Sequence, residues 1–452
     1  MSGTLHVWRE GGHVGVFVSH GEWDVRFSYD EDAPAGPISL SLPRDGGWSR
    51  NAPRAFLRNL LPEDPRTRVW MARFTGSDPD DFGLLDGADT VGGLTFTLSD
   101  EPHVPEPKPL RRMGDMRIAA RIAAVKCEPD DRWETDRVNK VSLAGAQAKF
   151  SLTRLGHEWY RSNDHTPSTH IFKPESPHTP DAELVEAACM RLSSLCRIDT
   201  PASGVARFDD QTTFWVERFD RRVEDGRIIR LHCEDLLQSM GLSAEHKYGV
   251  KARQVLALLH RADPTDALSY RWLERLAFNV GINNVDAHAK NYSIMLGGDG
   301  PTLAPMYDAM TTTYWKWVEP LLAMPVGNNR SASQVTARNW ETMAERNGLD
   351  PERTATMARV MAGRIIAFRE TAFDGLPVRV RDGLMRETDR ACLHIGPIDP
   401  RDAKAARDAY PQGGGATWVR PHVRAGRPVA GYWRPLPPTA MRRAGGARAR
   451  RP

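Results

Sequence analysis

The alternation of apolar and polar residues predicts strands through much of the first hundred residues. Residues 13–18 and 23–27 alternate or are rich in β-forming side chains, and residues 38–42 alternate between apolar residues and serine. Helical patterns follow at residues 53–61 and 65–74, and a further strand pattern lies at residues 91–96. These elements predict a small mixed domain over residues 1–100.

A proline-rich segment separates this domain from a second mixed one. Residues 101–110 have the composition of a stiff, extended linker. Residues 111–219 then combine strand patterns at 150–152, 159–161 and 214–219 with a helical pattern at 181–196. From residue 231 to about residue 373 the apolar spacing becomes helical, as in Trp272, Leu273, Leu276, Ala277 and Val280.

A strand-rich half followed by a helical half predicts an α+β protein with two lobes and a cleft between them. The β-rich N-terminal lobe is expected to contain the small domain and residues 111–219. The mostly helical C-terminal lobe is expected to span residues 220–400. The chain has 452 residues, which is long enough for two or three domains with a large buried core.

Composition places the chain among globular proteins of a reducing compartment. Hydrophobic residues make up 40% and charged residues 26%, and the mean hydropathy is −0.50. We find no long uncharged apolar run and no secretory signal at the N-terminus, so no membrane association is expected. The five cysteines lack zinc-like spacing, which fits a cytoplasmic protein.

Charge is distributed unevenly between the body of the chain and its last residues. Residues 411–452 contain nine arginines and no lysine, aspartate or glutamate, so this tail carries +9 and the rest −6. Its glycine, proline and arginine content predicts a disordered tail. Such a tail is either simply solvated or binds nucleic-acid phosphates through counterion release.

An aspartate and an asparagine five residues apart give the strongest chemical signal. Asp286 and Asn291 have the spacing of a kinase catalytic loop, in which the aspartate is the base and the asparagine binds metal. Asp308 offers a further carboxylate downstream. The alternative is structural: Asp286 would cap a helix, and Asn291 would lie in the adjacent turn.

Three further segments offer what phosphoryl transfer requires, and each also has an ordinary structural explanation. Gly145 lies in a small-residue loop that could approach phosphates closely, or could be a plain turn. Lys173 ends a strand and could bind phosphates, or could reach out to solvent. Glu217 and Phe219 could contact adenine, or could belong to an edge strand with solvated charges.

Taken together and in order, these segments resemble the HipA family of serine/threonine kinase toxins from bacterial type II toxin–antitoxin systems. The matching segments are residues 57–62, 91–94, 142–147 with Lys149, 169–173, 216–222, Glu234 with Asp235 and Gln238, 286–291, and Tyr307 with Asp308. The chain departs from the family at Ala148, where glutamate is common, and at Pro174, directly after the lysine. The resemblance runs from near the N-terminus to roughly residue 380.

The resemblance implies a two-lobed kinase-like fold and an ATP- and Mg²⁺-dependent active site. Asp286 would be the catalytic base, and Asn291 and Asp308 would bind Mg²⁺. The implied nucleotide contacts are Ser142, Ala144, Gly145, Ala146, Gln147, Lys173, Glu217, Phe219, His288 and Lys290. Ser142 matches the family's autophosphorylated serine, and phosphate there would place negative charge beside the ATP phosphates and inactivate the enzyme.

The resemblance also implies partners. These are a protein substrate, namely an aminoacyl-tRNA synthetase, and a helix-turn-helix antitoxin of the HipB type that brings the complex to operator DNA. A small-molecule kinase of the aminoglycoside phosphotransferase type remains an alternative. A non-catalytic DNA-associated regulator, in which the arginine-rich tail contacts DNA, is another.

Overall fold

The computed structural model describes residues 3–21, 24–102, 108–127, 148–163, 165–298, 300–409, 416–419, 422–424, 427–429 and 432–435. The chain divides into two compact units. One is rich in strands and contains residues 1–191, 199–249 and 288–308, and the other contains residues 192–198, 250–287 and 309–452. No helix in the described ranges has both the length and the apolar character needed to cross a membrane. The five cysteines are free thiols.

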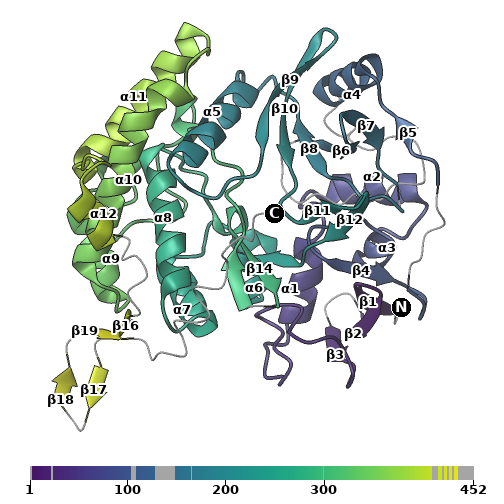
Figure 1. Cartoon of the computed structure of the whole chain (residues 1–452). Helices are drawn as coiled ribbons and strands as arrows, with labels where there is room; N and C mark the ends of the chain where they lie inside the picture. The colour runs from purple at the N-terminus through teal and green to yellow at the C-terminus, as the bar shows by residue number, and fades with distance from the viewer. Residues whose placement is uncertain are drawn as a thin grey trace. The chain divides into compact units, whose positions relative to one another are not determined.

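A four-stranded antiparallel sheet with three helices forms the N-terminal part of the strand-rich unit (Figure 1). Its strand order is β3-β2-β1-β4, and its elements are β1 (Gly3–Arg9), β2 (Gly12–Ser19), β3 (Val25–Tyr29), α1 (Ala52–Asn59), α2 (Pro65–Thr75), α3 (Asp81–Leu85) and β4 (Leu94–Thr97). Alternate residues of β1, such as Leu5 and Val7, enter the core. Helix α2 begins where Asp64 accepts a hydrogen bond from the Arg66 N–H, and it ends at the left-handed Gly76. The strands and helices predicted here are confirmed, except at residues 38–42.

The strand predicted at residues 38–42 is wrong. Only an isolated bridge between Ser39 and Leu42 occurs there. The Leu40 N–H donates to Glu234 Oε1 at 2.8 Å, and Ser39 Oγ donates to the Gln238 carbonyl oxygen at 3.2 Å. The alternating pattern arises because apolar residues enter the core while the segment's polar groups bind a distant helix start, and not because of a sheet.

A six-stranded antiparallel sheet forms the second part of this unit. Its order is β5-β7-β6-β8-β10-β9, with β5 (Arg111–Arg112), β6 (Phe150–Leu155), β7 (Glu158–Arg161), β8 (His170–Lys173), β9 (Ser203–Phe208) and β10 (Gln211–Glu217). Helix α4 (Asp115–Cys127) packs against the sheet in a core that includes Ile118, Ile122 and Phe172. Helix α5 (Ala182–Leu195) follows β8 in the chain, as the helical pattern at residues 181–196 predicts.

Smaller elements complete the strand-rich unit. They are the hairpin β11 (Arg221–Glu224) and β12 (Arg227–Arg230), the sheet β13 (Cys233–Asp235), β14 (Ser293–Gly297) and β15 (Gly300–Leu303), the helix α6 (Leu236–Met240), and the 3-10 turns η1 (Ala244–His246) and η2 (Ala289–Asn291). Helix α6 begins with a capping box, in which Asp235 and Gln238 bind each other's backbone N–H groups.

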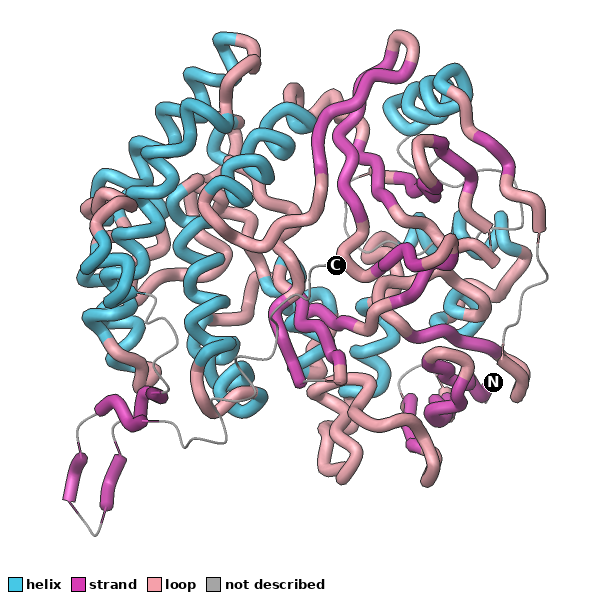
Figure 2. Tube along the Cα trace, in the orientation of Figure 1, coloured by secondary structure: helices cyan, strands magenta, loops and turns pink. Residues whose placement is uncertain are grey.

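Helices dominate the second unit (Figure 2). They are α7 (Ala252–Ala262), α8 (Ala267–Gly281), α9 (Ala337–Arg346), α10 (Pro351–Ala372), α11 (Val378–Ile395) and α12 (Ala403–Ala409), with 3-10 turns η3 (Thr312–Tyr314) and η4 (Ala332–Gln334). Helix α10 is central and contacts α8, α9, α11 and α12. A Cβ at Gly281 would lie 2.4 Å from Ile365 Cδ1, so glycine permits the close approach of α8 to α10.

The division of the chain differs from the predicted one. The sequence pattern places all of residues 220–400 in the helical lobe, whereas residues 220–249 and 288–308 belong to the strand-rich unit. Short strands also occur in the tail that was expected to be disordered. Strand β16 (Ala416–Val419) pairs with β19 (Tyr432–Pro435), and β17 (His422–Arg424) pairs with β18 (Arg427–Val429).

A buried ion cluster joins the N-terminal sheet domain to the segment after β10. Asp89 Oδ1 accepts hydrogen bonds from Arg221 at 2.8 Å and Arg230 at 2.7 Å, and Asp220 Oδ2 accepts from Arg218 at 2.8 Å and Arg221 at 2.7 Å. Burial alone would raise the pKa of Asp89, but the three guanidinium groups hold it well below its usual range. Arg218, Asp220 and Arg221 are therefore buried and paired rather than solvated. Strand β10 lies between β8 and β9, so it is not the edge strand of the alternative, although Glu217 at its end is exposed.

A histidine supports the same junction. The His232 Nε2–H group lies 2.8 Å from the Ile38 carbonyl oxygen, and the Gly93 N–H donates to Nδ1 at 3.4 Å. A Cβ at Gly93 would come within 2.9 Å of the His232 backbone nitrogen, so only glycine allows this approach. Burial lowers the pKa of His232 to about 4, although the bond to Ile38 opposes the shift.

We expect Asp89→Ala to lower the free energy of unfolding by about 3 to 5 kcal/mol, because it leaves buried guanidinium groups without a counter-charge. Urea denaturation followed by circular dichroism measures the change. The matched control is Glu341→Ala, which removes an exposed partner of Arg338 and should cost less than about 1 kcal/mol. Equal costs for the two variants would contradict the structural role of the cluster.

We expect the protein to lose stability between pH 6.5 and pH 4 partly through His232. Above a pKa of about 6.5, the ordinary value for histidine, the side chain is neutral in both states and contributes no pH dependence. Below it the unfolded chain binds a proton that the folded protein excludes until about pH 4, so acid favours unfolding. His232→Gln should therefore flatten the decline in unfolding free energy over this range, as measured by urea titrations at several pH values. An unchanged slope would rule out a neutral buried His232.

Candidate active site

A lysine lies at the end of a strand in the middle of the six-stranded sheet. Strand β8 runs between β6 and β10, and its Phe172 is fully buried and stacks on Phe150 with ring centres 5.1 Å apart. Because neighbouring side chains of a strand point to opposite faces, Lys173 faces away from the core that contains α4. Its Nζ atom lies 5.7 Å from the centre of the Phe214 ring.

Two carboxylates bind this lysine. The Lys173 ammonium donates to Glu186 Oε1 at 2.6 Å and to Asp308 Oδ1 at 2.7 Å. Asn291 joins the group, because its Nδ2 donates to the other Asp308 oxygen at 2.8 Å. Four segments of the strand-rich unit thus meet here: β8, α5, η2 and the loop after β15. The structure brings together three residues that the sequence singled out, Lys173, Asn291 and Asp308.

One cation shared by two carboxylates sets the electrostatics of this cluster. Burial alone would lower the pKa of Lys173, but Asp308 and Glu186 raise it above its ordinary value. Burial alone would raise the pKa of Asp308, but Lys173 holds it well below its usual range. The Glu186 side chain is 2% exposed and that of Asp308 41% exposed, and burial raises the pKa of Glu186 to about 7. Asp308 is therefore the ionised and accessible carboxylate.

The geometry fits a hard divalent cation. The amide of Asn291 and the carboxylate of Asp308 offer neutral and anionic oxygen ligands within one hydrogen bond of each other. Mg²⁺ typically binds one or two protein oxygens and takes its remaining ligands from water and phosphate. The residues present fit such an ion.

Tyr307 fixes the loop that carries Asp308. Its hydroxyl donates to the Lys290 carbonyl oxygen at 2.7 Å and lies 2.7 Å from Ser293 Oγ. Its ring stacks on Phe219, with centres 5.2 Å apart and planes inclined by 23°. Asp308 itself has a left-handed backbone, with φ of 56°, a conformation that aspartate tolerates better than most residues. Phe219 is thus held beside the loop of Asp308. Glu217 is exposed at the end of β10.

Lys290, one of the predicted nucleotide contacts, is bound by two side chains of the protein. Its buried ammonium donates to Asn59 Oδ1 at 2.8 Å and to Asp235 Oδ2 at 2.8 Å. Asn59 also donates from Nδ2 to the Ala55 and Leu242 carbonyl oxygens, each at 2.8 Å. Lys290 therefore joins the loop of Asn291 to α1 through Asn59 and to the start of α6 through Asp235. The same two bonds satisfy its charge.

The other predicted residues lie in three different settings. His288 is buried and meets the Tyr248 ring edge-on, with centres 5.0 Å apart. Asp286 is exposed, and its backbone N–H donates to Asn284 Oδ1 at 3.2 Å. It belongs to the stretch 250–287 of the helical unit. Residues 142–147, with Ser142, Ala144, Gly145, Ala146 and Gln147, lie outside the described ranges.

Sequence reasoning missed Glu186 and Asn59. Glu186 is a carboxylate inside an otherwise apolar stretch of helix, and this is the signal that could have identified it. Asn59 belongs to a recognised segment, 57–62, but nothing in the sequence names Lys290 as its partner. Glu186 is hidden within the regular pattern of a helix. Asn59 and Lys290 are 231 residues apart in the chain.

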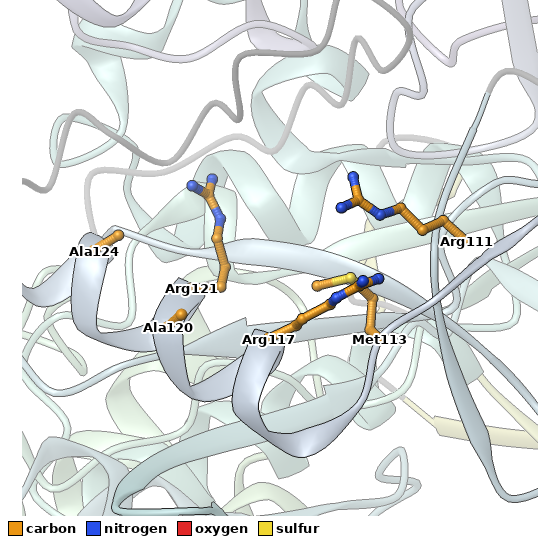
Figure 3. Close-up of a pocket in the computed structure, with 6 residues that line it drawn as sticks. All are labelled: Arg111, Met113, Arg117, Ala120, Arg121 and Ala124. Carbon is orange, nitrogen blue, oxygen red and sulfur yellow. The ribbon is translucent and has the colours of Figure 1, made fainter.

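A positively charged hollow lies elsewhere in the strand-rich unit (Figure 3). Its volume is about 280 Å³, and it is lined by Arg111, Met113, Arg117, Ala120, Arg121 and Ala124. Three guanidinium groups from β5 and α4 border it, and Arg117 also donates to the Arg112 carbonyl oxygen at 3.3 Å. Its lining suits anionic groups, but it shares no residue with the Lys173 cluster.

Family models match both parts of the chain. The model described as HipA N-terminal domain matches residues 5–97, and the model described as HipA-like C-terminal domain matches residues 141–367. The putative kinase Y4mE of Sinorhizobium fredii is 32% identical over 76% of this chain and 86% of its own length. The serine/threonine-protein kinase toxin HipA of Shewanella oneidensis is 28% identical over 72% of this chain and 78% of its own length.

A solved structure shares the fold. In the complex of HipA, HipB and operator DNA from Shewanella oneidensis, the matching chain is 24% identical and superimposes with a TM-score of 0.71. The match covers 86% of this chain and 96% of that one.

We expect Lys290→Met to lower the free energy of unfolding by about 3 kcal/mol, because Asp235 would lose its buried counter-charge. Urea denaturation of the two proteins measures this. Lys251→Met, at an exposed position before α7, is the matched control and should change stability by less than about 0.5 kcal/mol. If both variants were as stable as the unmodified protein, Lys290 would not have the structural role assigned here.

Proposed function

This chain belongs to the HipA family and is a serine/threonine kinase, and from that premise we propose that it is a toxin that transfers the γ-phosphate of ATP to a protein hydroxyl. The observation that carries the proposal is the Lys173–Glu186–Asp308–Asn291 cluster. Protein kinases use a strand lysine paired with a helix glutamate, together with an aspartate and an asparagine that bind metal. Here a strand lysine, a helix glutamate, an aspartate and an asparagine meet within hydrogen-bonding distance.

Each residue of this cluster has a proposed task. Lys173 positions the ATP phosphates, and Glu186 holds its ammonium in place. Asn291 and Asp308 would bind Mg²⁺, which neutralises phosphate charge when bound.

Two further segments have proposed contacts with ATP. Glu217 and Phe219 form the adenine contact, a role supported by the stacking of Phe219 beside the loop of Asp308. The small-residue segment 142–147 is proposed to cradle the phosphates.

Asp286 is the proposed base. Its spacing of five residues before Asn291 is that of a kinase catalytic loop, and its side chain is exposed. The carboxylate would accept the proton of the attacking hydroxyl as its oxygen bonds to the γ-phosphorus, while the bond from that phosphorus to the β–γ bridging oxygen breaks and ADP leaves. Lys290 and His288 act by positioning this loop, because their side chains contact other parts of the protein.

Ser142 is the proposed site of autophosphorylation. A phosphate there carries close to two negative charges at neutral pH. It would repel the phosphates of ATP from the same loop and so switch the kinase off.

The proposed partners come from the family. We propose an aminoacyl-tRNA synthetase as substrate, so that phosphorylation stops tRNA charging in the cytoplasm. A helix-turn-helix antitoxin is the proposed binding partner, and the relative solved with HipB and operator DNA supports such an assembly. The nine arginines of the tail would add phosphate contacts when that complex binds DNA.

We expect Asp286→Asn to abolish phosphate transfer from labelled ATP and to abolish growth inhibition when the protein is produced without antitoxin. The amide cannot accept the proton, and the fold should be unaffected because the side chain is exposed. Mass spectrometry of the unmodified protein after incubation with ATP and Mg²⁺ should locate phosphate on Ser142. Asp382→Asn, at an exposed position in α11, is the control and should keep full activity.

The outcomes separate the candidate functions. Full activity of Asp286→Asn would refute the assignment of the base. Phosphate transfer to an aminoglycoside, with none to protein, would favour the small-molecule kinase instead. Absence of any transfer from ATP, together with DNA binding that depends on residues 411–452, would favour the non-catalytic regulator.

A further inference from the structure

Two histidines face each other on the hairpin of β1 and β2, in the N-terminal part of the strand-rich unit. The residues of β1 alternate between two faces, so Leu5 and Val7 enter the core while His6 and Trp8 lie on the other face. His13 pairs with Trp8 across the hairpin, and this brings its ring diagonally opposite His6. The two imidazole centres are 5.2 Å apart.

A carboxylate approaches the same two rings. Asp100 follows β4, the strand that pairs with β1 on its other side. The distance from His6 Nδ1 to Asp100 Oδ1 is 3.2 Å, and that from His6 Nδ1 to His13 Nε2 is 3.0 Å. The ligand atoms of the three residues all lie within 4.8 Å of one another, and in the described part of the chain no other group of three such residues is so close.

These separations match the edges of a metal coordination sphere. Zinc–nitrogen and zinc–oxygen bonds of about 2.0 to 2.2 Å in a tetrahedral arrangement place neighbouring ligand atoms roughly 3.3 Å apart. The two short distances at His6 Nδ1 fall close to that value. A cation could therefore enter with only small movements of the side chains.

The tautomer of His13 is set for metal binding. Its Nδ1–H group donates to the carboxylate of Asp30, at the end of β3. In the neutral tautomer that makes this bond, Nε2 is the acceptor nitrogen, and it lies 3.0 Å from His6 Nδ1. Histidines that bind metals typically donate their other ring N–H to a carboxylate in this way, which fixes the ring and strengthens the ligand. The His13 ring also meets Trp8 edge-on, with centres 4.5 Å apart, and packing therefore limits its rotation.

We propose that His6, His13 and Asp100 bind a divalent transition-metal ion of the zinc class. Two imidazole nitrogens and one carboxylate oxygen suit Zn²⁺ and its neighbours, whereas Mg²⁺ prefers oxygen ligands alone. Three protein ligands leave a fourth position for water. Asp30 is the positioning residue, because it acts through His13.

The site would tie the exit of the N-terminal sheet domain to its own hairpin. Asp100 is highly exposed, and it immediately precedes the proline-rich segment 101–110. Bound metal would hold this point of the chain against β1 and β2. The consequence is a metal-dependent anchor at the start of the linker, separate from the oxygen ligands Asn291 and Asp308 and independent of phosphate transfer.

Titration of the full-length protein with Zn²⁺ tests the proposal. The protein is first stripped with a chelator, and Zn²⁺ is added in excess Mg²⁺ against a chromogenic competitor, so that oxygen-only sites are filled by Mg²⁺. We expect one zinc ion per chain and a rise in melting temperature with Zn²⁺. His6→Ala and His13→Ala should lose this ion, and Asp30→Asn should weaken it by about 10- to 100-fold. His157→Ala, at an exposed turn, is the matched control and should bind like the unmodified protein.

X-ray absorption of the zinc-loaded unmodified protein provides a readout that does not depend on the folding of any variant. Two imidazoles with oxygen ligands and no sulfur support the proposal. Sulfur ligands would overturn it, because they would place the ion at cysteines. The same holds if the unmodified protein binds no Zn²⁺, or if folded His6→Ala and His13→Ala retain the ion with unchanged affinity.

Discussion

The ammonium group of Lys173 is the point on which the arrangement of the candidate active site depends. It binds Glu186, thirteen residues away on the next helix, and Asp308, 135 residues away in the chain. Burying the charged groups of Lys173 and Glu186 is expensive unless they are neutralised. The sheet, the helix and the distant loop that carries Asp308 must therefore all be in place for the cluster to be stable. The same arrangement leaves Asp308 ionised and partly exposed. A structural requirement and a chemical one are therefore met by one set of contacts.

The N-terminal sheet domain is attached to the rest of the strand-rich unit largely by buried polar contacts. Asp89 binds guanidinium groups that follow β10, His232 lies against Gly93, and Asn59 receives the ammonium of Lys290. Each contact requires a specific partner, because an unpaired buried charge or amide would be costly. Apolar packing tolerates small displacements, whereas these bonds define one position for the domain against the loop of Asn291.

Sequence patterns predicted the elements whose environment is local and failed where a residue's partner is remote. The alternation in residues 13–18 and the helix signals around Pro65 were sufficient, because strand faces and helix caps depend on neighbouring residues. Residues 38–42 alternate for another reason, since their polar groups bind Glu234 and Gln238. The predicted grouping of Lys173, Asn291 and Asp308 came from motif order. The apolar surroundings of Glu186 mark it as unusual, but one carboxylate in a helix does not reveal that its partner is Lys173. Motif spacing likewise identified Lys290, but it did not show that the Lys290 ammonium donates to Asn59 and Asp235.

The strand-rich unit is assembled from three separate stretches of chain, the last of which ends at residue 308. During synthesis on the ribosome, Lys173 is made long before Asp308, with 135 residues between them. At about 5 to 20 residues per second, this interval lasts roughly 7 to 27 s. For most of that time the nascent chain contains Lys173 and Glu186, but not the Asp308 carboxylate that completes their cluster. The order of translation thus delays completion of the Lys173–Glu186–Asp308 cluster until Asp308 has been made.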